Sequence, residues 1–227
     1  MKIGILETGG PPPALVAPFG TYPDMIRALL GDARYDFTRY DVQAGELPPV
    51  EDNDAYIVTG SPAGVYDDLP WIAALIDWLR GAKGKAKLVG ICFGHQVMAE
   101  AFGGRVLKSD KGWGIGLHRY EVRERAPWMD DAASFAIPVS HQDQVVELPP
   151  RSRVLAGSAF NPFGLIAYDD QPAISCQCHP EFEPAYAQAL VESRRGRLPD
   201  PDQAIESLDQ PDDRARLGEW IGRFLDG

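Results

Sequence analysis

Short hydrophobic runs alternate along the first hundred residues with stretches whose apolar side chains recur at helical spacing. The hydrophobic runs predict strands at residues 2–6, 35–40, 55–59 and 86–91, and the helically spaced stretches predict helices at residues 21–30, 69–81 and 94–102. This alternation is typical of a mostly parallel sheet covered by helices on both faces. We therefore expect an α/β fold, a flavodoxin-like doubly wound sheet.

The pattern changes after Gly104, where strands follow one another without helices between them. Strands are expected at residues 105–108, 115–123, 135–139, 153–157, 164–168 and 172–178. Such a change predicts an antiparallel β extension, followed by a return of the chain to the main sheet.

The last part of the chain differs in composition from the rest. We expect one domain over residues 1–195, then an acidic, proline-containing connector and an amphipathic helix within residues 196–227. The predicted helix, residues 211–225, carries Leu217, Trp220, Ile221 and Phe224 on one face. That face either docks on its own domain or forms a surface for a partner or a second copy.

Composition excludes several classes of function. The chain has 227 residues, 44% of them hydrophobic, enough to bury a full core. Its net charge of −11, without a basic cluster, argues against nucleic acid as a partner. Three cysteines do not form a disulfide framework. Without a signal peptide or an apolar run of membrane length, the expected location is cytoplasmic, with no membrane contact.

The candidate nucleophile is Cys92, which lies between the apolar run 86–91 and the helical stretch 94–102. Gly90 and Gly94 flank it, and small neighbours allow the sharp strand-to-helix turn that presents a nucleophile. The positive end of the following helix favours an anionic sulfur there. The alternative is a buried, inert cysteine.

A base and its orienting carboxylate are expected at His179 and Glu181, where a β-type run ends in His-Pro-Glu. Residues two apart in an extended chain point to the same side, and Pro180 favours that conformation for His179. Glu181 can then fix one imidazole tautomer while the other ring nitrogen faces Cys92. Alone, the segment would be an exposed polar strand end.

A third segment supplies candidate hydrogen-bond donors for an oxyanion. The strand 55–59 breaks at Gly60 into a Gly-Ser-Pro loop, and we assign the N–H groups of Gly60 and Phe93 as the donors. Without the other two segments, the loop would be ordinary turn chemistry.

Together the three segments resemble the class I glutamine amidotransferases. Their nucleophile motif, Gly-x-Cys-x-Gly-x-Gln, corresponds to residues 90–96 here, and their His-Pro-Glu to residues 179–181. The resemblance covers roughly residues 1–195. It implies that Cys92 attacks the side-chain amide of glutamine or a related γ-glutamyl amide, that His179 protonates the leaving amine, and that water then releases glutamate from a γ-glutamyl thioester.

The family also has a substrate-binding segment before its histidine, and residues 139–145 are similar to the Ser-His-x-Asp form of GMP synthetase amidotransferase domains. The resemblance places Ser140, Gln142, Asp143 and Gln96 at the amino-acid end of the substrate, where an anionic Asp143 suits an α-ammonium group. The alternative is a polar turn between strands. Trp113 is a further candidate contact.

Two other sites are disfavoured, and no metal or cofactor is expected. Cys176, Cys178 and His179 lack the second ligand pair of a structural zinc site, and Gly9-Gly10 precedes three prolines that favour a rigid loop over a phosphate-binding helix start. The open alternatives are a stand-alone hydrolase, a glutaminase subunit that delivers ammonia to a separate synthetase, and an inactive binding module.

Overall fold

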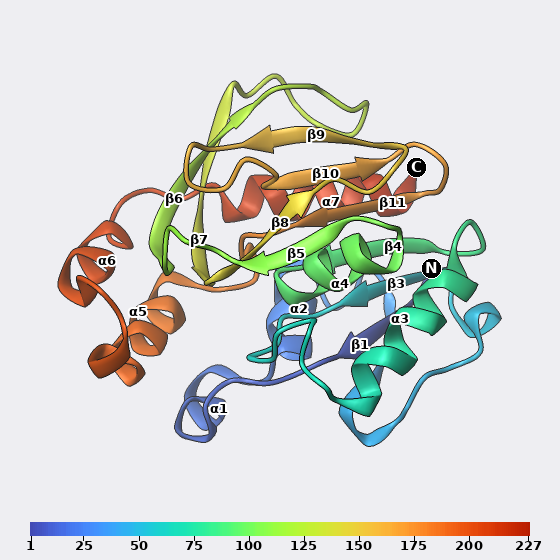
Figure 1. The fold of residues 1–227 in the computed structure, drawn as a ribbon, viewed down its shortest axis with the longest axis horizontal. Helices are drawn as coiled ribbons and strands as arrows, with labels where there is room; N and C mark the ends of the chain where they lie inside the picture. Colours follow the sequence, from blue (N-terminus) through green and yellow to red (C-terminus); the bar gives the residue numbers. More distant parts are fainter.

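A computed structural model describes residues 1–227, and its centre is a nine-stranded mixed sheet with helices on both faces (Figure 1). The strand order is β2-β1-β3-β4-β11-β10-β9-β6-β7. The architecture confirms the predicted α/β fold class.

The first part of the sheet is parallel. It comprises β2 (Asp36–Asp41), β1 (Lys2–Glu7), β3 (Ala55–Val58), β4 (Lys87–Ile91) and β11 (Ala173–Cys176). The order in which β1 lies between β2 and β3 is that of doubly wound, flavodoxin-like sheets, which gather ligands at the carboxyl ends of their strands. Both Cys92 and the His179 segment follow carboxyl ends in this part, after β4 and β11.

The second part is antiparallel, as expected. It comprises β10 (Leu165–Tyr168), β9 (Ser152–Gly157), β6 (Gly114–Val122) and β7 (Ser134–His141). A separate two-stranded sheet pairs β5 (Arg105–Lys108) with β8 (Asp143–Glu147). The β8 strand was not predicted, since the polar residues at its start indicate a turn; the turn between β7 and β8 is confined to Gln142.

Helices bury apolar side chains against both faces of the parallel part. On one face α2 (Tyr22–Leu30) and α7 (Arg214–Asp226) pack over Ile3 and Ile5, and on the other α3 (Pro70–Ala82) and α4 (Phe93–Ala101) pack near Leu6. Because successive residues of a strand point to opposite faces, β1 contributes to both cores.

Three helices were not predicted: α1 (Pro13–Phe19), α5 (Pro184–Ser193) and α6 (Pro201–Ser207). Each begins at a proline, whose fixed φ suits the first helical position and whose missing N–H costs nothing there. From the sequence, these segments were expected to be loops or connector, because proline also terminates helices. Short 3-10 helices span Val42–Ala44, Val50–Asp52 and Arg195–Arg197.

The terminal helix α7 packs into the main core. Trp220 is 1% exposed and lies edge-on to Phe135, and Lys87 donates a 2.7 Å hydrogen bond to the carbonyl of Leu225 at the end of the helix. The apolar face of this helix is therefore occupied by its own chain. None of the helices is long and apolar enough to cross a membrane.

Candidate active site

Cys92 occupies a strained turn between β4 and α4. Its backbone has φ 54° and ψ −100°, a conformation that costs a non-glycine residue roughly 1–3 kcal/mol. The turn brings α4 close to β3: the Gly94 N–H donates to the carbonyl of Thr59 at 3.1 Å, and a Cβ on Gly94 would lie 2.2 Å from the carbonyl oxygen of Val58. There is therefore no room for a side chain at position 94.

His179 is held on three sides. Its backbone N–H donates to the carbonyl of Pro138 at 2.9 Å, and its Nδ1 lies 2.7 Å from Oε1 of Glu181. The ring also stacks on Phe182. The side chains of His179 and Glu181 are only 4% and 1% exposed, so the pair is shielded from water.

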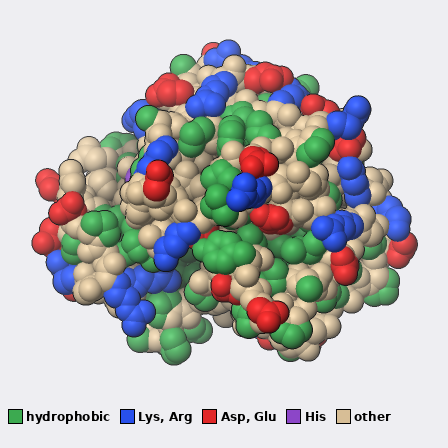
Figure 2. All heavy atoms as spheres, viewed as in Figure 1, with side chains coloured by type: hydrophobic (Ala, Val, Ile, Leu, Met, Phe, Trp, Pro, Cys, Tyr) green, Lys and Arg blue, Asp and Glu red, His purple; other side chains and the backbone are tan.

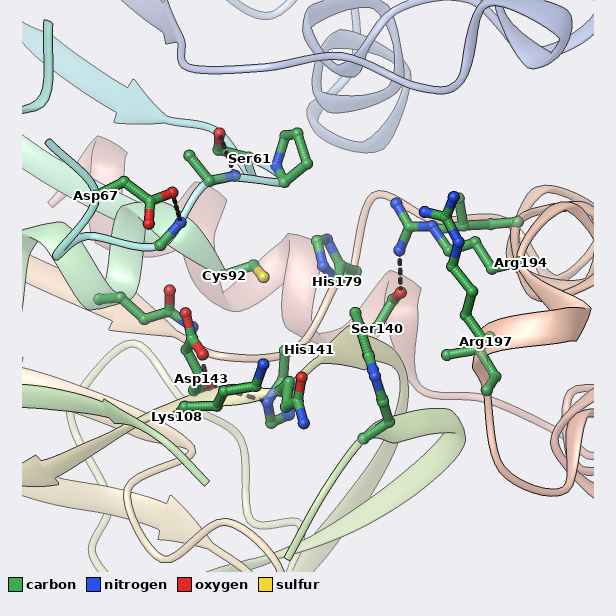
Figure 3. Close-up of a pocket in the computed structure, with 18 of the residues that line it drawn as sticks. Ser61, Asp67, Cys92, Lys108, Ser140, His141, Asp143, His179, Arg194 and Arg197 are labelled. Atoms are coloured by element: carbon green, nitrogen blue, oxygen red, sulfur yellow. Dashed lines mark hydrogen bonds between the residues drawn. The ribbon is translucent and has the colours of Figure 1, made fainter. Parts of the chain in front are cut away.

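The side chains of His179 and Cys92 lie near each other in the cavity (Figure 3), and both approach Gly60. A Cβ added to Gly60 would lie 3.1 Å from Cε1 of His179 and 3.8 Å from Cβ of Cys92, so no side chain can occupy that position without touching both. Burial disfavours the charged imidazole, but the negative charges of Cys92 and Glu181 outweigh it and raise the pKa of His179 to about 10. The structure thus favours an imidazolium beside Cys92.

The proposed oxyanion donors lie beside the turn. Gly60 follows β3 by two residues, and Phe93 is the first residue of α4. Neither backbone N–H donates a hydrogen bond to another group of the protein. Both donors therefore remain available for an atom of a bound molecule.

Two glutamines connect Cys92 to the predicted substrate segment. Gln177 is fully buried, and its Nε2 lies 3.6 Å from the sulfur of Cys92. Gln96 Nε2 donates to Oε1 of Gln177 at 3.2 Å and to the backbone carbonyl of Asp143 at 3.0 Å. The sequence assigned Gln96 to the site but missed Gln177.

A cavity of about 540 Å³ opens over Cys92 and His179. Gln96, Ser140, Gln142, Asp143 and Trp113, all singled out in the sequence, contribute to its lining. Glu181, Gly60 and Phe93 are not among its lining residues; Glu181 lies behind His179 and faces a second cavity.

One end of the cavity carries carboxylates. Oδ1 of Asp143 accepts a 2.9 Å hydrogen bond from the hydroxyl of Tyr66, and Asp67 also lines this end (Figure 3). Half-burial raises the pKa of Asp143, although the bond from Tyr66 and the charge of Lys108 oppose the shift.

Several lining residues were missed by sequence reasoning: Tyr66, Asp67, Lys108, Phe182, Arg194 and Arg197. Phe182 follows the His-Pro-Glu segment directly, which is a local signal. The others come from a loop, from strand β5 and from the segment that follows α5, and nothing in their local sequence indicates that the fold brings them to Cys92.

The sequence matches the family model for class-I glutamine amidotransferases over residues 21–193, most of the chain. The chain belongs to this family. This match confirms the family resemblance predicted from residues 90–96 and 179–181.

Similar proteins agree with this membership. This chain is 28% identical over 243 aligned residues to a glutamine amidotransferase-like protein of Schizosaccharomyces pombe, with 98% of each chain covered. It is 30% identical over 174 residues to gamma-glutamyl peptidase 4 of Arabidopsis thaliana, covering 72% of this chain and 69% of the relative.

Solved structures share the fold. A glutamine amidotransferase from Thermotoga maritima superposes with a TM-score of 0.80 at 18% identity, over 100% of this chain and 98% of that chain. One from Methylobacillus flagellatus gives 0.77 at 21% identity, over 99% and 91%.

Proposed function

We propose that the protein hydrolyses the γ-amide bond of glutamine or of a γ-glutamyl compound with Cys92 as nucleophile. The observation that carries the proposal is the convergence of Cys92 and His179 on Gly60, with Glu181 bonded to the far side of the imidazole. This is the arrangement that nucleophilic acyl transfer by a cysteine needs.

The reaction follows from the positions of these groups. The Cys92 thiolate attacks the γ-carbonyl carbon, and the C–S bond forms as the carbonyl electrons move to oxygen. The free N–H groups of Gly60 and Phe93 support assignment as donors to that oxyanion. When the C–N bond breaks, the leaving amine takes the proton of His179 and a γ-glutamyl thioester remains.

Hydrolysis of the thioester completes the cycle. The now neutral His179 accepts a proton from water, whose oxygen attacks the thioester carbon and releases glutamate and the Cys92 thiolate. Glu181 holds the ring through Nδ1 during both proton transfers, because its oxygen lies 2.7 Å from that nitrogen.

The carboxylate end of the cavity supports binding of an amino-acid group. Asp143 is assigned to the α-ammonium, and Lys108, whose positive charge acts on Asp143, is assigned to the α-carboxylate. Gln96 lies beside Asp143, to whose backbone carbonyl it donates, and Gln142 lines the same cavity. Ser140 lies toward the opposite end, where its hydroxyl accepts a hydrogen bond from Arg194.

Two settings are compatible with this chemistry: a stand-alone hydrolase, and a glutaminase subunit that passes ammonia to a synthetase. Curated relatives include both gamma-glutamyl peptidases and a glutamine-hydrolysing GMP synthase subunit of Ignicoccus hospitalis, which is 31% identical over 155 residues. We favour the stand-alone hydrolase, since the apolar face of α7 packs on its own core and is not left for a partner.

A substrate screen with the purified chain tests the proposal. We expect turnover of at least one γ-glutamyl amide or peptide on the order of 1 per second or faster, without any added protein. A glutaminase subunit would show negligible turnover alone and gain activity when a synthetase of the same cell is added. An inactive binding module would show no turnover in either case.

A further inference from the structure

Two arginines in the segment just after α5, Arg194 and Arg197, line the cavity without a carboxylate partner. Arg194 donates to the hydroxyl of Ser140 at 3.1 Å, and neither Arg194 nor Arg197 forms an ion pair. Arg195, between them, pairs with Glu192 at 2.7 Å and Asp202 at 2.8 Å and does not line the cavity.

Two guanidinium groups without a carboxylate partner are unexpected in this chain, because its acidic side chains outnumber its basic ones. The chain has 33 Asp and Glu against 22 Lys and Arg, and most of its other arginines have a carboxylate within 4 Å. Figure 2 shows basic side chains gathered around α5, at the lower left of the view. Two free guanidinium groups lining one cavity are a ready anion site.

The arginines lie on the side of the cavity where the leaving amine must be. The carboxylates of Asp67 and Asp143 lie to one side of Cys92 in Figure 3, whereas Arg194 and Arg197 lie beyond His179 on the other side. The hydrogen bond from Arg194 to Ser140 on β7 also places this arginine near His179. Ser140 is two residues after Pro138, whose carbonyl accepts the N–H of His179.

In the proposed reaction, each end of the cavity holds a different part of the substrate. The γ-glutamyl group extends from Cys92 toward Asp143, and the leaving amine faces His179, which supplies its proton. Whatever is attached to that amine therefore extends toward the arginines. Ammonia, the leaving group of glutamine, carries nothing that could reach them.

We infer that the preferred substrate is a γ-glutamyl amino acid or peptide, whose leaving amine carries a carboxylate bound by Arg194 and Arg197. This inference rests on the proposed function. The half-buried Trp113 packs near Leu198 beside these arginines and gives the leaving amino acid an apolar wall. A cavity of about 540 Å³ falls within the range that holds ligands larger than glutamine.

A matched pair of substrates isolates the carboxylate. γ-Glutamylglycine and γ-glutamylglycinamide differ in one group, a carboxylate in the first and a neutral amide in the second. We expect kcat/KM to be about tenfold higher for γ-glutamylglycine, because a charge-assisted hydrogen bond in a half-exposed site contributes about that factor. The ratio of the two values is the readout, so a partial loss of folded protein does not affect it.

Arginine variants then locate the effect. Arg197→Met and Arg194→Met should each move the ratio toward one, and Arg194→Lys should retain part of it. Arg195→Met is the matched control, because it removes the same charge from a side chain already paired outside the cavity, and its ratio should equal that of the unchanged protein.

The outcomes separate the two proposals. Equal turnover of both substrates by the unchanged protein, or a ratio that survives both Arg194→Met and Arg197→Met, overturns the carboxylate site while leaving γ-glutamyl hydrolysis intact. Absence of turnover on both substrates and on glutamine contradicts the proposed function, and the present inference with it.

Discussion

The imidazole of His179 lies flat on the phenyl ring of Phe182, with ring centroids 3.8 Å apart and 6° between the ring planes. Phe182 is itself held edge-on by Tyr186, and it is 1% exposed. Glu181 thus holds the ring of His179 through Nδ1, and Phe182 fixes the plane of the ring. The second of these supports comes from packing alone.

Replacing Phe182 should loosen that plane. We expect Phe182→Leu to lower kcat by about tenfold to a hundredfold with little change in KM, because misplacement of a reacting group by a fraction of an ångström costs rate more than affinity. Steady-state kinetics would show it. Phe37→Leu, at the edge strand β2, is the control for lost aromatic volume. A Phe182→Leu enzyme that is less stable but has unchanged kcat would leave Phe182 with a structural role only.

The charge state of His179 predicts the alkaline limit of activity. Its burial disfavours the charged ring, but Cys92 and Glu181 raise its pKa to about 10, so the imidazolium persists at neutral pH and is lost as the pH rises through about 10. Because the leaving amine needs that proton, kcat/KM should decline there.

Glu181→Gln removes one of the negative charges that raise this pKa, so the alkaline decline should move to lower pH, with a residual rate above that of His179→Ala. A pH profile of kcat/KM for the variants measures both effects. Glu183→Gln removes the same charge from an exposed position two residues away and should leave the profile unchanged. If the pH profile of Glu181→Gln coincided with that of the unchanged protein, the alkaline decline of kcat/KM would belong to a group other than His179.

Close packing of α4 against β3 predicts a sharp difference between two glycine substitutions. Gly94→Ala should destabilise the fold by about 3 kcal/mol, since its Cβ would lie 2.2 Å from a backbone oxygen of Val58. Gly81→Ala, exposed in α3 with nothing within 4 Å of the added atom, should stabilise it by about 0.5 kcal/mol. Urea unfolding of both variants gives the two values. If Gly94→Ala changed the free energy of unfolding as little as Gly81→Ala does, α4 could move away from β3 at little cost.

The parts of the site that sequence could predict are those encoded locally. Gly90, Cys92 and Gly94 lie on one turn, and His179 and Glu181 on one extended segment, so spacing alone relates their side chains. The alternation of runs likewise predicted the parallel strands and the change to antiparallel pairing after Gly104.

Residues contributed by distant segments could not be predicted in this way. Arg194 reaches the cavity because α5 begins at Pro184 and runs back past β7, and Tyr66 reaches Asp143 across 77 positions of sequence. Strand β8 was missed because Asp143 and Gln144 have low strand propensity, and pairing with β5 overrides it.

The most direct test of Cys92 as the nucleophile is to identify which cysteine carries the acyl group. A glutamine-mimicking diazo-ketone, followed by proteolysis and mass spectrometry, should place a single adduct on Cys92, which lines the cavity, and none on Cys176 or Cys178, which do not. Cys92→Ser should lose both the adduct and γ-glutamyl hydrolysis while keeping its unfolding midpoint. An adduct on Cys176 or Cys178, or full hydrolysis by Cys92→Ser, would contradict the assignment of Cys92 as the nucleophile.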